Sequence, residues 1–125
     1  MATISVLVDT DICIDYFNTG RFSSVLDSPR CRVYYSIVTT KELLSKPGLR
    51  AVEREAILAE LNRWRIVQLT EAITVRYSEL RHQYPSLEKE DALIAASALV
   101  KNVPLITRNK RHFYLVKGLT ILSSS

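Results

Sequence analysis

Short runs of apolar residues alternate along the chain with longer segments in which apolar residues recur every three or four positions. The first run, residues 3–8, is nearly all apolar and β-branched. This pattern is typical of a strand that is covered on both faces, as in a parallel sheet. Four further short runs predict additional strands at residues 33–36, 66–69, 104–107 and 119–122.

The segments between these runs have the periodicity of helices. One segment places Ile57, Leu61 and Trp64 on a single helix face. Residues 87–100 form the most apolar helix candidate. The alternation predicts an α/β fold in which helices flank a central, mostly parallel sheet, and residues 1–125 are expected to form a single domain. Another helix is predicted from apolar residues at spacings of four, three and four: Ile73, Tyr77, Leu80 and Tyr84.

Composition and charge narrow the classes of protein that fit. The chain has 125 residues, of which 47% are apolar and 24% charged, and these values exclude a disordered or collagen-like chain. The net charge of +4 allows a polyanionic partner without requiring one. No apolar run approaches the ~20 residues that span a bilayer, and the first residues lack the features of a signal peptide. We therefore expect a cytoplasmic protein with no membrane partner, in which Cys13 and Cys31 are reduced, buried thiols.

Three acidic residues stand where apolar residues predominate. Asp9 directly follows the first strand, Glu42 comes shortly after the second, and Asp91 interrupts the start of the most apolar helix. Functional sites in parallel α/β sheets lie beyond the C-terminal ends of the strands. Each residue also has a structural alternative. Asp9 could be a helix N-cap, Thr39 and Glu42 match a capping box, and Asp91 could complement its helix dipole.

Clustered carboxylates repel one another, and their pKa values rise unless a cation is present. Mg²⁺ prefers oxygen ligands, binds one or two carboxylates directly and retains several waters. Such a site can activate water to attack phosphorus and can neutralise charge on the phosphate. The two histidines, His82 and His112, do not have the spacing of a zinc site. The acidic residues therefore favour Mg²⁺-dependent phosphodiester hydrolysis.

Four motifs in this order resemble the PIN domain, and specifically the VapC-type toxins of toxin–antitoxin pairs. The motifs occupy residues 7–11, 36–43, 90–99 and 105–113, so the resemblance spans nearly the whole chain. It implies a sheet of four or five parallel strands in the order 3-2-1-4-5. In that order, Asp9 faces the turn at residues 107–109.

The resemblance also implies an activity and its residues. VapC-type toxins are similar in being Mg²⁺- or Mn²⁺-dependent endoribonucleases, and by position Asp9, Glu42 and Asp91 match three of their acids, with Asp9 and Asp91 expected to hold the metal. The fourth acid is missing, since Asn109 and His112 stand where the family often has an acid. Asn109 can orient a water but supplies no charge, and it could instead cap the next helix. A VapB-like antitoxin and a homodimer are expected by resemblance alone.

Basic residues follow the fourth predicted strand and predict an RNA-binding ring around the acidic site. These residues could equally be solvated surface charges. Phe113 could stack on an unpaired base or belong to the core, and Tyr114 follows it. Asp11 is interpreted as a cap or a solvated neighbour of the site. The basic candidates are Arg108, Lys110, Arg111 and His112.

Two other functions compete with a ribonuclease toxin. A non-catalytic PIN domain would bind RNA or a protein partner without cutting, which the missing fourth acid favours. A phosphorelay receiver domain also has an acid after its first strand, but it needs an Asp after a third strand near mid-chain. Residues 46–70 contain no Asp, which argues against a receiver.

Overall fold

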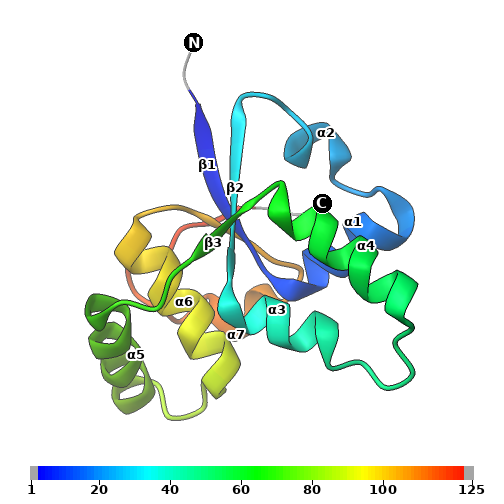
Figure 1. The fold of residues 1–125 in the computed structure, drawn as a ribbon. Helices are drawn as coiled ribbons and strands as arrows, with labels where there is room; N and C mark the ends of the chain where they lie inside the picture. Colours follow the sequence, from blue (N-terminus) through cyan, green and yellow to red (C-terminus); the bar gives the residue numbers. More distant parts are fainter. Residues whose placement is uncertain (1–2, 123–125) are drawn as a thin grey trace.

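The protein is built around a five-stranded parallel sheet, which a computed structural model describes over residues 3–122. The strand order is β3-β2-β1-β4-β5, so β1 lies at the centre between β2 and β4 (Figure 1). This order and the parallel pairing confirm the predicted fold. The strands are β1 (Ile4–Val8), β2 (Cys31–Ser36), β3 (Arg65–Val67), β4 (Leu105–Ile106) and β5 (Ile121–Leu122).

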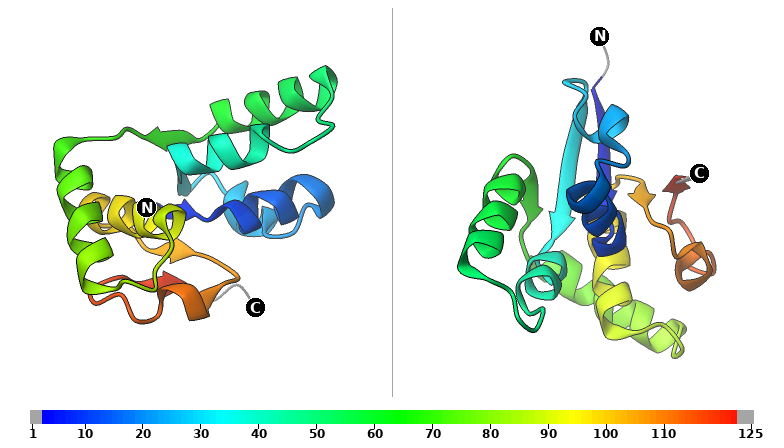
Figure 2. Two further views of the ribbon diagram at one scale, coloured as in Figure 1. Left: turned by 90° about the horizontal axis from the view of Figure 1, so that it is seen from below. Right: turned by 90° about the vertical axis from the view of Figure 1, so that its right-hand side faces the viewer.

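Helices cover both faces of this sheet, as the two further views in Figure 2 show. Helices α5, α6 and α7 pack on one face, and α1, α2 and α4 pack on the other, while α3 contributes to both cores. The helices are α1 (Thr10–Thr19), α2 (Ser23–Leu26), α3 (Ile37–Leu44), α4 (Ala51–Asn62), α5 (Glu71–Gln83), α6 (Lys89–Lys101) and α7 (Lys110–Phe113).

Strand β1 explains how one short apolar run supports two cores. Successive side chains of a strand point to opposite faces. Val6 and Val8 therefore pack with the helices of one side, and Leu7 packs with those of the other. All three side chains are fully buried. The continuous apolar run thus reflects burial on both faces.

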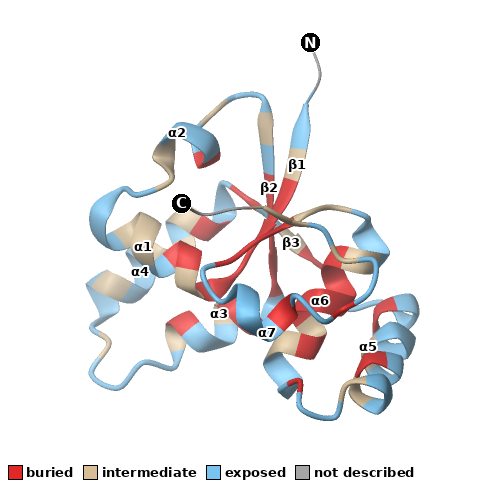
Figure 3. Cartoon of the chain, turned by 180° about the vertical axis from the view of Figure 1, so that it is seen from behind, coloured by how far each residue is buried: buried red, intermediate tan, exposed pale blue. Residues whose placement is uncertain are grey.

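Helix α6 packs closely on the sheet because its inner face carries small side chains. Ala92, Ala95, Ala96 and Ala98 are buried, and Figure 3 shows buried residues concentrated in the central strands and along α6. The one buried polar side chain of α6, Ser97, donates its hydroxyl to the Leu93 carbonyl oxygen at 2.8 Å. This hydrogen bond stays within α6 and needs no partner from the sheet, and Asp91 lies in the first turn of the same helix.

The structure corrects three details of the sequence-based predictions. Helix α4 ends at Asn62, so Trp64 packs into the core from the turn before β3. Strand β3 ends at Val67, and Leu69 is exposed. Cys13 is buried as expected, whereas Cys31 is only partly buried at the start of β2, and both are free thiols. Across residues 3–122, no helix is both long and apolar enough to cross a bilayer.

Candidate active site

Asp9 lies at the point where the two central strands β1 and β4 end together. Val8 pairs with Ile106, so the residues that follow, Asp9 and Thr107, are neighbours across the sheet. The Asp9 side chain is 5% exposed. Its Oδ1 accepts the Thr10 backbone N–H at 2.8 Å, and its Oδ2 accepts the Thr107 hydroxyl at 2.7 Å. Asp9 is therefore both the N-cap of α1 and the buried acid of the site.

The surroundings of Asp9 disfavour its charge. Burial raises the pKa of Asp9 from 3.8 to about 6, and repulsion from the Asp11 and Asp91 carboxylates adds to this effect. The hydrogen bonds from Thr107 and Thr10 oppose the rise in the pKa of Asp9 because they stabilise the carboxylate. The site therefore brings Asp9, Asp11 and Asp91 within electrostatic reach of one another.

Glu42 joins this group through Thr10. The Thr10 hydroxyl donates to Glu42 Oε1 at 2.7 Å and lies 3.0 Å from the Thr39 hydroxyl. Helix α3 begins at Ile37, where the Ser36 hydroxyl caps it by accepting the Val38 N–H at 3.1 Å. Thr39 is thus inside the helix, and the capping-box interpretation of Thr39 and Glu42 is wrong. The Glu42 carboxylate instead connects α3 to the residue that follows Asp9.

Asp91 contacts a residue that the sequence placed with the RNA-binding group. Its Oδ2 lies 3.0 Å from His112 Nδ1. Burial raises the pKa of Asp91, while the neighbouring His112 opposes the rise. Asp91 also lies in the first turn of α6, where a negative charge is favourable. The helix-dipole role and the site role therefore coexist in this residue.

Asp11 lies in the first turn of α1 as a neighbour of the candidate site, and the cap of that helix is Asp9. It is half-buried, and its Oδ2 accepts the Arg108 backbone N–H at 3.2 Å. Its Oδ1 is buried and has no hydrogen-bond partner among residues 3–122. Burial raises the pKa of Asp11. The available signal was its spacing, since a second acid two residues after Asp9 falls in the first turn of the same helix.

The carboxylate oxygens of this site suit a hydrated hard cation such as Mg²⁺. Within residues 3–122, no three Asp, Glu, His or Cys side chains converge as a ready-made metal cage. Mg²⁺ does not need such a cage, because it binds one or two carboxylates and keeps several waters. The buried Asp9 carboxylate and the unpartnered Asp11 Oδ1 provide oxygen ligands of the kind that such an ion prefers.

Asn109 lies beside this group and is exposed. Its backbone N–H donates to the Thr107 hydroxyl oxygen at 3.0 Å, so one hydroxyl links Asn109 to Asp9. Asn109 occupies the N-cap position of α7, but its side chain makes no capping hydrogen bond. The alternative in which its side chain caps this helix is therefore wrong, and Thr107 is the residue that stabilises the turn.

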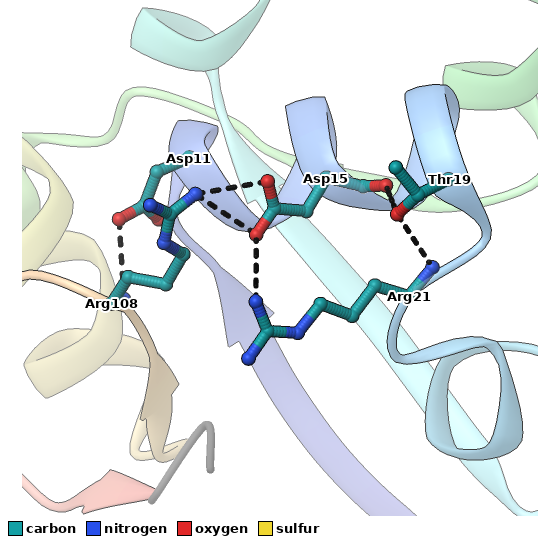
Figure 4. A network of polar contacts seen from close by, with 5 residues as sticks. All are labelled: Asp11, Asp15, Thr19, Arg21 and Arg108. Atoms are coloured by element: carbon teal, nitrogen blue, oxygen red, sulfur yellow. Dashed lines mark hydrogen bonds and ion pairs between the residues drawn. The ribbon is translucent and has the colours of Figure 1, made fainter.

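Arg108 has an intramolecular partner. Its guanidinium donates to both carboxylate oxygens of Asp15 at 2.9 Å, and Arg21 approaches the same carboxylate at 3.8 Å. Figure 4 shows Arg108 and Arg21 converging on Asp15, with Asp11 close by. Both contacts use Arg108 Nη1, so an RNA-binding role for Arg108 would depend on Nε and Nη2 or on breaking this ion pair.

The other predicted RNA-binding residues are on the surface beside the site. Lys110, Arg111 and His112 are all exposed. Phe113 is fully buried in the core, which excludes it as a stacking platform, whereas Tyr114 is 68% exposed. The core alternative for Phe113 is therefore correct.

The family of the chain follows from comparison with known proteins. The family model described as the PIN domain matches residues 6–119, and the chain belongs to this family. Membership excludes the phosphorelay receiver alternative.

Individual relatives and structures agree with this assignment. Ribonuclease VapC1 of Methanocaldococcus jannaschii is 32% identical over 123 residues, which cover 93% of this chain and 85% of the relative. Ribonuclease VapC10 of Mycobacterium tuberculosis is 30% identical over 124 residues, covering 91% of this chain and 90% of that protein. A toxin–antitoxin complex from Klebsiella pneumoniae contains a chain that is 26% identical, with a TM-score of 0.79, and the match covers 96% of this chain and 98% of that chain.

Proposed function

We propose that this protein is a divalent-metal-dependent endoribonuclease that cleaves RNA phosphodiester bonds and acts as the toxin of a toxin–antitoxin pair. Two relatives that match almost the whole chain are named as VapC ribonucleases, and a structure with the same fold is a toxin–antitoxin complex. Membership of the PIN-domain family supports the same reaction.

The burial of the Asp9 carboxylate among other acidic side chains is the observation that carries the proposal. It is buried at the C-terminal end of the central strand, and repulsion from Asp11 and Asp91 helps raise its pKa to about 6. Capping of α1 by Asp9 needs an oxygen acceptor but no charge, so a charged carboxylate under this repulsion supports a positively charged ligand. A Mg²⁺ or Mn²⁺ ion held by Asp9 and Asp91 would offset the repulsion.

The residues of the chain then have distinct roles. Thr10 and Thr107 fix the two oxygens of Asp9 through hydrogen bonds, so this carboxylate is oriented before any ligand arrives. Glu42, held by the Thr10 hydroxyl, and Asn109, beside Thr107, orient water near the scissile phosphate. When bound, the cation neutralises charge on the phosphate and favours deprotonation of a water.

A cleavage assay with a parallel binding measurement tests the proposal. We expect the purified protein to cut single-stranded RNA with Mn²⁺ or Mg²⁺ and not with EDTA, and Asp9→Asn to abolish cutting while retaining the fold. Calorimetric titration of Mn²⁺ into both proteins detects loss of metal binding, and circular dichroism of Asp9→Asn checks that the fold is retained. RNA cleavage that persists in EDTA would contradict the metal-dependent mechanism.

A non-catalytic PIN domain is the second candidate. The contact between His112 and Asp91 Oδ2 favours it, because this oxygen already has a partner. In that case the protein would bind RNA or a protein without cutting. Intact RNA after incubation with Mn²⁺, together with measurable RNA binding, would select this candidate.

The biological setting belongs to the same proposal. A VapB-like antitoxin would cover the acidic site, and an arginine of the antitoxin could pair with the clustered carboxylates. Expression in the cytoplasm should arrest growth, and co-expression of the antitoxin should relieve the arrest. Harmless expression of a metal-active enzyme would count against the toxin role. A homodimer stays a prediction, which light scattering can check.

A further inference from the structure

A small cavity of about 180 Å³ opens directly beside Asp91. Its walls come from the turn between α5 and α6 and from α7 and the residues that follow it. We call it the Asp91 cavity. Its lining includes Tyr84, Ser86, Glu88, Arg111, His112 and Leu115. Because Asp91 itself forms part of the wall, a ligand in this cavity would lie next to the acidic site.

Hydrogen bonds to the backbone fix the shape of this cavity. The Arg81 guanidinium donates to the Leu87 carbonyl oxygen at 2.8 Å, which holds the turn between α5 and α6. The Lys117 backbone N–H donates to the Tyr84 hydroxyl oxygen at 3.1 Å, which ties the Tyr84 ring to the opposite wall. The cavity is therefore largely formed before a ligand binds, which lowers the entropic cost of binding.

Polar groups around the cavity are free to bind a ligand. Over residues 3–122, neither the Ser86 hydroxyl nor the Arg111 guanidinium makes a hydrogen bond or an ion pair. Both residues are exposed at the rim. The His112 ring is held through Nδ1 by Asp91, which leaves its Nε2 without a partner in this part of the chain. Apolar surface lies between these groups, from Leu87, Leu115 and Val116.

We propose that the Asp91 cavity binds the unpaired base of a nucleotide adjacent to the scissile phosphate of the RNA. This inference rests on the proposed ribonuclease function. A base has apolar faces and a polar edge, and single-stranded RNA is recognised by stacking on aromatic rings together with hydrogen bonds to base edges. Tyr84 supplies an aromatic wall, and Ser86 and Arg111 supply donors for the base edge.

Two simpler ligands fit the cavity less well. A phosphate alone would leave the leucine and valine surface without a partner. An apolar side chain of a protein would bury the Arg111 guanidinium without an acceptor, which is costly. The mixture of an aromatic wall, aliphatic surface and unpaired donors favours a base. Phe113 belongs to the core and cannot stack on a base, whereas Tyr84 is the aromatic residue that lines this cavity.

The test uses a short single-stranded RNA that the wild-type protein cuts at one mapped bond. An abasic nucleotide is placed in turn at each position around that bond. We expect one position at which the abasic substitution lowers kcat/KM by about tenfold, equivalent to about 1.4 kcal/mol. Binding of the same set of fluorescent RNAs in EDTA, followed by anisotropy, should have the same position dependence, since this binding requires no metal or cleavage.

Variants connect that position to the cavity. Ser86→Trp fills the cavity from an exposed position, and Ser78→Trp places the same side chain on an exposed part of α5 outside the cavity lining. Ser86→Trp should weaken binding of intact RNA by about tenfold (about 1.4 kcal/mol) and should remove the penalty of the abasic nucleotide. Ser78→Trp should behave as wild type. Leu115→Ala, at a residue that is 55% exposed, removes part of the apolar lining of the cavity without adding bulk.

The outcomes separate this inference from the proposed function. Equal binding and cleavage of all abasic RNAs by the wild type would overturn the base-binding assignment, even if RNA is cleaved. A position-dependent binding penalty without any cleavage in Mn²⁺ would support the cavity and contradict the nuclease. If Ser86→Trp loses only inhibition by the antitoxin, with RNA binding unchanged, the cavity binds a protein segment and the inference is wrong.

Discussion

The Thr107 hydroxyl donates to Asp9 Oδ2 at 2.7 Å, and it joins two buried residues that are 98 positions apart in the chain. The same hydroxyl oxygen accepts the Asn109 backbone N–H at 3.0 Å. Thr107 therefore couples the end of β4, the turn that carries Asn109 and the acid at the end of β1. One hydroxyl holds together three parts of the candidate site.

Replacement of Thr107 by Val removes that hydroxyl while keeping the shape of the side chain. The buried Asp9 carboxylate and the Asn109 N–H would each lose a partner. We expect the free energy of unfolding to fall by about 1.5–3 kcal/mol, the range for a hydrogen bond to a charged group. Chemical denaturation measures this, and Thr107→Ser, which keeps the hydroxyl, is the matched control. A Thr107→Val protein as stable as Thr107→Ser would mean that the hydrogen bond contributes little.

The raised pKa of Asp9 predicts a pH-dependent stability in EDTA. Its pKa in the fold is about 6 against an ordinary value of 3.8. Its stabilising contribution is therefore fully present below about pH 4 and is lost as the pH rises through about 6. A difference of about 2 pKa units corresponds to about 3 kcal/mol.

Asp9→Asn isolates this contribution from that of the other acids. In EDTA, we expect the variant to be more stable than wild type at pH 8, and the difference to shrink toward pH 4.5. Mg²⁺ should stabilise wild type at pH 8 and have less effect on the variant. Urea denaturation at the two pH values measures both effects. A difference that does not vary with pH would show that Asp9 is not titrating as described.

The sequence predicts the sheet more completely than the site. The apolar runs predict β1 and β4, and the strand order implied by the family resemblance places Asp9 opposite Thr107, as the structure shows. The role of Glu42 depends on where α3 begins, and the capping-box pattern of Thr39 pointed to the wrong start because Ser36 caps the helix three residues earlier. Ser36 and Thr39 are both suitable N-cap residues by type. Which of them caps α3 depends on tertiary contacts that a local sequence pattern does not contain.

Charged residues were harder to predict for a related reason. From the sequence, Asp11 could be a cap or a solvated neighbour of the site, and Arg108 could be an RNA-binding residue or a solvated charge. The Arg108 guanidinium binds Asp15, which is 93 positions away, and the Arg108 backbone N–H binds Asp11. The pairing of such residues is set by the meeting of α1 with the turn after β4. That contact is visible only once the sheet order is known.

Substitution of Asp91 by Asn tests its proposed role as the second metal ligand. The side-chain shape is retained and the charge is lost, so cleavage of RNA should be abolished while the circular dichroism spectrum is unchanged. Because burial raises the pKa of Asp91, removal of its charge should also raise the unfolding temperature at pH 8 in EDTA. Glu90→Gln, at the exposed neighbouring position, is the matched control and should retain activity. Undiminished cleavage by Asp91→Asn would remove this residue from the site.

The ion pair between Arg108 and Asp15 predicts that the basic residues contribute unequally to RNA binding. Arg108→Ala should lower stability by less than about 1 kcal/mol, since the Arg108 side chain is 50% exposed. It should change RNA affinity little, whereas Arg111→Ala should weaken RNA binding. Fluorescence anisotropy in EDTA compares the two variants directly. A larger effect of Arg108→Ala on RNA affinity would contradict this prediction and show that Arg108 binds RNA.

The last prediction concerns Asn109, where the sequence departs from the family pattern. The four acids of the candidate site, Asp9, Asp11, Glu42 and Asp91, supply a charge of at most −4, and this charge is lower in the absence of a cation because burial raises the pKa values of Asp9, Asp11 and Asp91. We therefore expect one weakly bound ion in the free protein, with any second ion recruited by RNA phosphates. Asn109→Asp should tighten Mn²⁺ binding, and Asn109→Ala should weaken it.

The geometry of the turn makes this substitution series easy to interpret. The Asn109 side chain makes no capping hydrogen bond, so Asn109→Ala should cost much less than the ~1 kcal/mol of a lost N-cap. A change in metal affinity would then report the side-chain oxygen itself and not a disturbed helix. Calorimetric titration of Mn²⁺ into the three proteins, with thermal unfolding in EDTA as the folding control, distinguishes the roles. Equal affinities across the series would place Asn109 outside the metal site and leave Thr107 as the only functional side chain of the turn.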